Sequence, residues 1–182
     1  EMRLSKRGGD HIGGDIRYEG LSRDFAINDL GFLRRSNIHN LRGGINVRGN
    51  NPWRFTRRRG LNFNTSASWN LDGDKLRQNF NANANTQLMS WWWTNIGYGR
   101  NLSVLDDVET RDNGLLRLPA NNFYWWGIDS DFRKNVSGGL FLNIGGDRDG
   151  DFRSVSLNTR IRIKDNIEIR IQPRYSQSRG VS

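Results

Sequence analysis

Ser154-Val-Ser-Leu-Asn-Thr-Arg-Ile-Arg-Ile163 and, three residues later, Ile167-Glu-Ile-Arg-Ile171 alternate apolar and polar side chains almost without error. Only a β-strand, whose side chains point to opposite faces at every second residue, separates residues in this way. A hairpin that keeps the isoleucine face continuous pairs Ile163 with Ile167 and leaves Lys164-Asp165-Asn166 as a three-residue loop. The stretch therefore predicts one hairpin with two very different faces.

The same construction occurs upstream, in residues 61–71 and 75–88. Aromatic and aliphatic residues occupy one side of each segment, and asparagines occupy most of the other side. Because the apolar positions are odd-numbered in the first segment and even-numbered in the second, matching faces require a loop of even length. Gly73-Asp74 in a tight turn, with Asp72 and Lys75 as a cross-strand charge pair, meets this requirement.

Alternation and turn residues predict about nine strands in the whole chain. We place them at residues 10–20, 38–49, 58–72, 75–88, 91–103, 122–134, 138–147, 152–164 and 167–178. Many are about twice as long as the five or six residues usual in soluble sheets. They approach the roughly 9–11 residues that cross a bilayer when tilted. The prediction is an all-β fold: an antiparallel meander of long amphipathic strands that is part of a transmembrane β-barrel.

The low hydrophobicity of the chain agrees with a barrel. Only 35% of the residues are hydrophobic and the mean hydropathy is -0.78. A transmembrane barrel presents apolar side chains at alternate positions and fills its interior with polar ones. Long and short connections also mostly alternate along the chain, which is typical of outer-membrane barrels.

In such a barrel the apolar side of each strand faces lipid and the polar side faces the lumen. The residues predicted to face lipid are Phe63, Trp69, Phe80, Leu157, Ile161, Ile163, Ile167, Ile169 and Ile171. The residues predicted to face the lumen are Arg160, Arg162, Arg170, Arg174, Glu168, Asn62, Asn64, Asn81 and Asn83. An open lumen would favour anionic solutes, whereas in a plugged lumen these arginines would pair with acids such as Glu168, Asp129 and Asp131.

Nine strands do not make a complete barrel. A sheet in lipid cannot leave backbone groups unpaired at its edge, and bacterial single-chain barrels have even strand numbers. We therefore expect residues 1–182 to form one segment of a larger barrel in the bacterial outer membrane. The expected partners are outer-membrane lipid, lipopolysaccharide, and the remaining strands of the same barrel or other membrane subunits.

Three blocks of sequence resemble a known family. They are Asn28-Asp-Leu-Gly-Phe-Leu-Arg-Arg35, Asn79-Phe-Asn-Ala-Asn-Ala-Asn85, and Arg111-Asp-Asn-Gly-Leu-Leu-Arg-Leu-Pro119 followed by Asp129-Ser-Asp-Phe-Arg-Lys134. The chain is similar, over about residues 28–180, to the C-terminal barrel domain of large Gram-negative outer-membrane proteins of unknown function. Those proteins often carry an N-terminal carbohydrate-binding-type module, which this sequence does not contain. The resemblance implies an outer-membrane β-barrel and implies no reaction.

The net charge of +9 and the pI near 10.7 would ordinarily indicate nucleic acid. Here the arginines are spread over many strands and not gathered on one element, so we expect no nucleic-acid partner. The alternative interpretation is a soluble, basic β-sheet module that binds nucleic acid or an acidic glycan on its polar face.

Residues for catalysis or metal binding are few. His11 and His39 are the only histidines, and neither has a nucleophile or metal-ligand pattern nearby. Asp147, Asp149 and Asp151 alternate in a glycine-rich turn, which calcium can use, but the turn lacks the closing glutamate of an EF-hand. A solvated hairpin tip explains them better. We therefore predict no enzyme, no cofactor and no metal.

Overall fold

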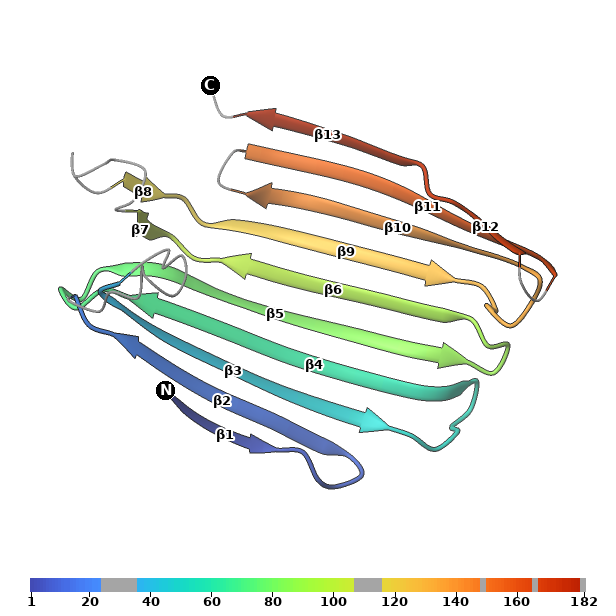
Figure 1. Ribbon diagram of the computed structural model, residues 1–182, viewed down its shortest axis with the longest axis horizontal. Helices are drawn as coiled ribbons and strands as arrows, with labels where there is room; N and C mark the ends of the chain where they lie inside the picture. The colour runs from blue at the N-terminus through green and yellow to red at the C-terminus, as the bar shows by residue number, and fades with distance from the viewer. Residues whose placement is uncertain (24–35, 107–115, 148–149, 165–166, 181–182) are drawn as a thin grey trace.

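The structure, a computed structural model, describes residues 1–23, 36–106, 116–147, 150–164 and 167–180. This part of the chain is built from β-strands and turns (Figure 1). The strands are β1 (Met2–Lys6), β2 (Ile12–Leu21), β3 (Ile38–Gly49), β4 (Thr56–Trp69), β5 (Lys75–Leu88), β6 (Trp93–Asn101), β7 (Val104–Asp106), β8 (Leu116–Leu118), β9 (Asn121–Asp129), β10 (Val136–Asp147), β11 (Gly150–Lys164), β12 (Ile167–Ile171) and β13 (Arg174–Gly180). No helix among these residues is long and apolar enough to span a membrane.

One 11-stranded antiparallel sheet contains all strands except β7 and β8, which form a small separate ribbon. Its order follows the chain from β1 to β6 and continues through β9, β10 and β11, which pairs with both β12 and β13. Figure 1 shows a single long layer with β1 and β13 on opposite sides. The predicted all-β antiparallel meander is confirmed. The sheet is not closed into a barrel, so closure remains a prediction.

All nine predicted strands are present, but the prediction missed β1, β7 and β8 and did not foresee the division of the last strand. Pro173 lies between β12 and β13 and accepts a hydrogen bond from the Leu157 N–H at 3.0 Å. Proline has no N–H to return to the ladder, which interrupts the strand there. The pairs Thr159–Ile171 and Ser156–Arg174 keep one register on both sides of the break.

The β11–β12 hairpin has the predicted register except at its turn. Ile161 lies opposite Ile169. A bulge then places Lys164, and not Ile163, opposite Ile167. The predicted Ile163–Ile167 pair is therefore wrong, because a bulge puts one extra residue into one strand. The rest of the predicted loop, Asp165-Asn166, lies outside the described residues.

The β4–β5 hairpin has a longer turn than predicted. Trp69 lies opposite Lys75, so the predicted Asp72–Lys75 pair is wrong. The Asn70 side chain organises the turn: its Oδ1 accepts the backbone N–H groups of Asp72 and Asp74 at 3.0 and 2.8 Å. Gly73 has φ 91°, which glycine adopts without strain. Because Phe63 still lies opposite Ala82, the two faces remain as predicted.

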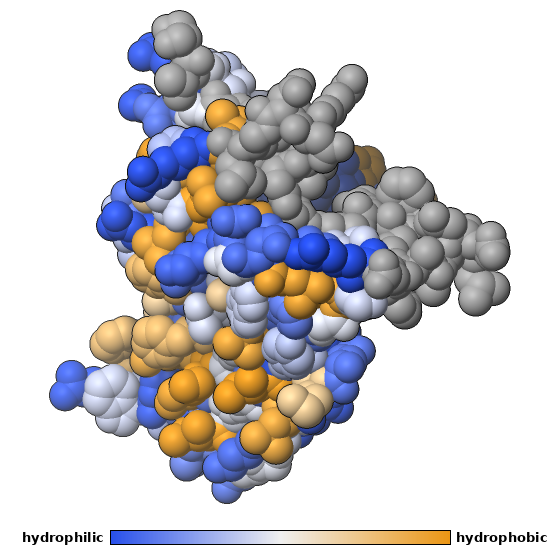
Figure 2. Space-filling model, turned by 90° about the vertical axis from the view of Figure 1, so that its left-hand side faces the viewer, coloured by the Kyte–Doolittle hydropathy of each residue, from blue (hydrophilic) through white to orange (hydrophobic). Residues whose placement is uncertain are grey.

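Burial in this sheet is the reverse of that in a soluble protein. In the described part of the chain no hydrophobic residue is buried, whereas Ser68, Gln87, Ser137 and Ser154 on the polar face are. Figure 2 shows apolar residues at the surface, beside polar residues and not beneath them. The accessible area is 13229 Å² for 21.0 kDa, against roughly 9,000 Å² for a compact monomer of that mass. The apolar face therefore has no cover.

Candidate functional site: the polar face of the sheet

Cross-strand pairing joins the predicted lumen residues into one continuous polar face. Asn62 lies opposite Asn83, and Arg160 lies opposite Arg170. Phe63 lies opposite Ala82 on the other face, where the apolar side chains gather. The residues predicted to face lipid lie on this apolar face of the strands, with Ile163 at the bulge beside the β11–β12 turn. The structure thus separates the two predicted sets, and what each face contacts remains a prediction.

Neutral amides occupy the polar face of β4 and β5. The side chains bond across the strands and not along them. The hydrogen bonds are Asn62 Nδ2 to Asn83 Oδ1 at 2.8 Å, Asn64 Nδ2 to Asn81 Oδ1 at 3.0 Å, and Ser66 Oγ to Asn79 Oδ1 at 3.0 Å. Each asparagine satisfies part of its neighbour's hydrogen-bonding capacity, which makes the middle of this face an uncharged amide surface, with Arg58 and Arg77 outside it.

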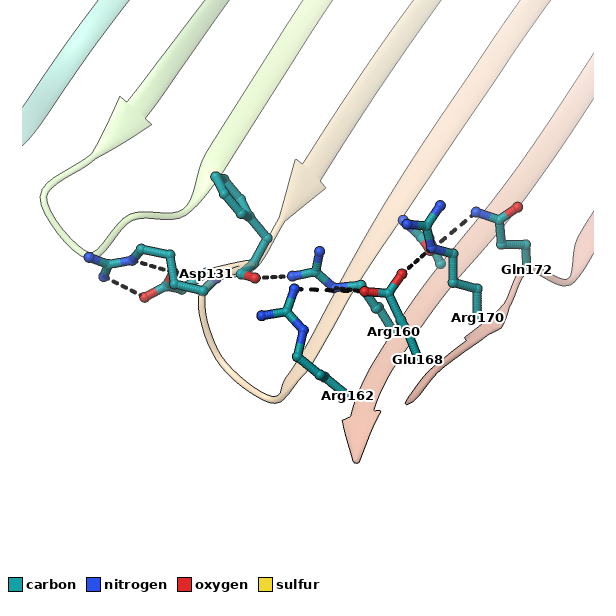
Figure 3. Close-up of polar contacts among 9 residues, drawn as sticks. Asp131, Arg160, Arg162, Glu168, Arg170 and Gln172 are labelled. Carbon is teal, nitrogen blue, oxygen red and sulfur yellow. Dashed lines mark hydrogen bonds and ion pairs between the residues drawn. The ribbon is translucent and has the colours of Figure 1, made fainter. Parts of the chain in front are cut away.

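A positively charged cluster occupies the same face of β11 and β12 (Figure 3). Glu168 lies among three guanidinium groups. Its oxygens are 2.6 Å from Arg170 Nε, 3.7 Å from Arg162 Nη2 and 4.0 Å from Arg160 Nε. One carboxylate cannot neutralise three guanidinium groups, so the cluster keeps positive charge and favours anions.

Asp131 pairs with a different arginine from those predicted. It lies in the β9–β10 turn, is only 5% exposed, and accepts two hydrogen bonds from the Arg133 guanidinium group at 2.8 and 2.7 Å and one from the Arg133 backbone N–H at 3.1 Å. These bonds to Arg133 are the main reason why the pKa of Asp131 falls to about 2. Asp131 therefore stabilises a turn and leaves the strand arginines with excess charge.

Trp91 lies in the β5–β6 turn and contacts arginines from the start of β4 and from the β9–β10 turn. The guanidinium carbons of Arg57 and Arg133 lie 3.8 and 3.5 Å from the centre of its ring. Two cations against one indole ring are a strong cation–π arrangement. Arg57 and Arg133 therefore help to hold the Trp91 ring in place.

Two aromatic residues of β9 lie on the polar face and not among the apolar side chains of the opposite face. Phe123 and Trp125 stack with ring centroids 5.8 Å apart. They lie over Gly99 and Gly97 of β6: an added Cβ would be 2.1 Å from Phe123 Cζ and 2.0 Å from Trp125 Cζ2. The missing side chains at these glycines make room for the rings. Alternating glycines opposite alternating aromatics were the available signal, but it becomes visible only when β6 is known to pair with β9.

Among the described residues, no group of three or more His, Asp or Glu side chains could hold a metal. His11 is exposed, and His39 contacts the Tyr18 hydroxyl at 2.5 Å. Asp149 and the side chain of Asp147 lie outside the described part, and Asp151 is exposed.

The fold and this surface define the class of protein: an antiparallel β-sheet whose polar and apolar side chains lie on opposite faces. The sequence profile of a family described as a domain of unknown function, DUF5916, matches residues 2–181, and the chain belongs to this family. No curated protein and no solved structure matches the chain.

Proposed function

We propose that this chain is part of the wall of a transmembrane β-barrel in a bacterial outer membrane. Its apolar face contacts lipid and lipopolysaccharide, and its polar face lines the interior. In this position it acts as a pore, an uptake component or a surface scaffold. The observation that carries the proposal is the reversed burial, because a sheet with an uncovered apolar face and a closely packed polar face suits hydrocarbon outside and water inside.

Strand length supports the proposal. β4 and β5 each have 14 residues and β11 has 15. At about 3.3 Å per residue each is long enough to cross a hydrocarbon layer of roughly 30 Å when tilted. Soluble sheets with uncovered faces of this length would expose far more apolar area than monomers usually do.

The open edges agree with a need for further strands. β1 pairs only with β2, and β12 and β13 pair only with β11. Their outward N–H and C=O groups have no partner within the described sheet, which lipid does not tolerate. Other strands of the same barrel, or of neighbouring subunits, would satisfy them.

Partition between water and lipid tests the membrane assignment. We expect the purified chain to aggregate without detergent, and to become protected from added protease after refolding into lipid vesicles. A chain that stays monomeric in detergent-free buffer would exclude the membrane assignment and favour a soluble, basic β-sheet module. Planar-bilayer conductance of the full protein then separates a pore from a scaffold, because a plugged barrel passes no ions.

A further inference from the structure

A hollow of about 280 Å³ lies on the polar face where β6, β9, β10, β11 and β12 run side by side. Trp93 and Asp129 form one wall, Arg160, Arg170 and Gln172 form the other, and Gly138 lies between them. Its volume is just below the roughly 300–1,000 Å³ of pockets for drug-sized ligands, which limits the occupant to a small solute.

The first wall attracts a cation. Trp93 lies directly opposite Asp129 in the β6–β9 pairing, so a ring and a carboxylate are neighbours. Asp129 Oδ1 occupies the space above Gly139, where an added Cβ would be 2.1 Å away. Within the described residues no arginine, lysine or histidine lies within ion-pair distance of Asp129. A carboxylate beside an aromatic ring is a favourable environment for an ammonium group.

The second wall attracts an anion. Arg160 and Arg170 share the single carboxylate of Glu168 with Arg162. The Nε of Arg160 is buried and has no hydrogen-bond partner among the described residues, because Glu168 Oε2 is 4.0 Å away. Arg170 keeps 65% of its side chain exposed. Gln172 donates to Asn158 at 3.4 Å and adds an amide at the same side (Figure 3).

Opposite charges on facing walls are unsuited to a simple anion, because Asp129 would repel it. We propose that the hollow binds a small zwitterion with separate ammonium and carboxylate groups, such as a short peptide. The carboxylate binds at Arg160 and Arg170, and the ammonium binds between Asp129 and Trp93. β9 and β11 are two strand spacings apart, about 10 Å between backbones, and side chains from both sides shorten this gap to a few ångström. All of these groups lie on the polar face, so the site is the same whatever covers the apolar face.

Chemically blocked ligands test the proposal on the unchanged protein. The full chain in detergent would be titrated calorimetrically with Ala-Ala, with N-acetyl-Ala-Ala, which lacks the ammonium, and with Ala-Ala amide, which lacks the carboxylate. We expect Ala-Ala to bind about tenfold more tightly than either blocked form, since each loses one charged contact. Equal binding of the N-acetyl form, or no binding of Ala-Ala, would overturn the proposal.

Two variants test which wall binds the ammonium group and which binds the carboxylate. Asp129→Asn should lower the affinity for Ala-Ala about tenfold and leave that for N-acetyl-Ala-Ala unchanged or increased. Arg170→Gln should weaken both ligands. Arg77→Gln, which removes an arginine from the polar face of β5 outside the hollow, is the matched control and should change neither. If Asp129→Asn weakens both ligands equally while its circular dichroism spectrum stays native, the ammonium site is wrong.

Discussion

The apolar and polar faces of this sheet share every strand, yet their side chains have opposite environments. On the apolar face Phe63 and Ile96 are 52% and 59% exposed, whereas Ser68 and Ser154 on the polar face are 7% and 6% exposed. The polar side chains are joined by hydrogen bonds between amide groups and by ion pairs, while the apolar side chains lack a covering layer. The difference teaches that side-chain contacts within the sheet hold the polar face together. The apolar face has no such cover and needs an apolar environment outside the sheet.

The largest effect should come from a charge on the apolar face. Phe63→Arg, near the middle of β4, should lower the free energy of unfolding in lipid by about 2–4 kcal/mol if that position lies near the bilayer midplane. Asn64→Arg, one residue further and on the polar face, should cost less than about 1 kcal/mol. Denaturant unfolding from vesicles measures both. Equal losses would remove the distinction between the faces.

The next largest effect should come from adding a side chain to a glycine on each face. Gly99→Ala should destabilise the sheet by roughly 1–3 kcal/mol, because the new Cβ would lie 2.1 Å from the Phe123 ring. Gly43→Ala on the apolar face meets nothing closer than Thr65 Cγ2 at 3.7 Å. This control should be neutral, or stabilising by about 0.4–1 kcal/mol through the unfolded state. If both variants behave alike in the same unfolding assay, the polar face is not the more crowded one.

A smaller effect is expected within the amide surface. Asn62→Ala and Asn83→Ala remove the two partners of one 2.8 Å hydrogen bond. A double-mutant cycle should give a coupling of about 0.5–1.5 kcal/mol, the usual net value of such a bond. The pair Asn62 and Ser154, which lie on strands far apart in the sheet, provides the uncoupled reference. Zero coupling between Asn62 and Asn83 would mean that hydrogen bonds to water replace the hydrogen bond between these two side chains.

The smallest effect should be present at neutral pH and disappear in acid. The folded pKa of Asp131, about 2, is below its ordinary value of 3.8, so its stabilising contribution is present above pH 3.8 and is lost as the pH falls toward 2. Asp131→Asn should therefore be less stable than the unchanged chain at pH 7, and the two should converge near pH 2. Unfolding midpoints measured across this range test the Arg133 pair. A constant difference would assign the stability of the turn to packing.

The strands were predictable because alternation is local, but the turns were not. At Asn70 the side chain bonds backbone groups two and four residues ahead, and this lengthened a turn that glycine alone would have kept tight. β1 was missed because Met2–Lys6 is too short to show a convincing period. Pro173 divided a strand whose faces were otherwise correctly assigned.

The sequence predicted only one of the two walls of the candidate site. Arg160 and Arg170 were expected on one face because they share a hairpin, and the structure places them opposite each other. Their approach to Asp129 and Trp93 required β6, β9, β10 and β11 to lie side by side. Strand neighbours across the long connection before β9 leave no periodic signal in the chain.

The amino-acid sequence by itself determined that the strands have two chemically different sides, because the two-residue side-chain period is a property of each strand alone. The tertiary structure decided which residues became neighbours: Phe123 and Trp125 over glycines, Glu168 among arginines, and Asp129 facing Arg160 across the hollow. The physical reason is register, because cross-strand contacts depend on pairing between segments that are distant in the chain.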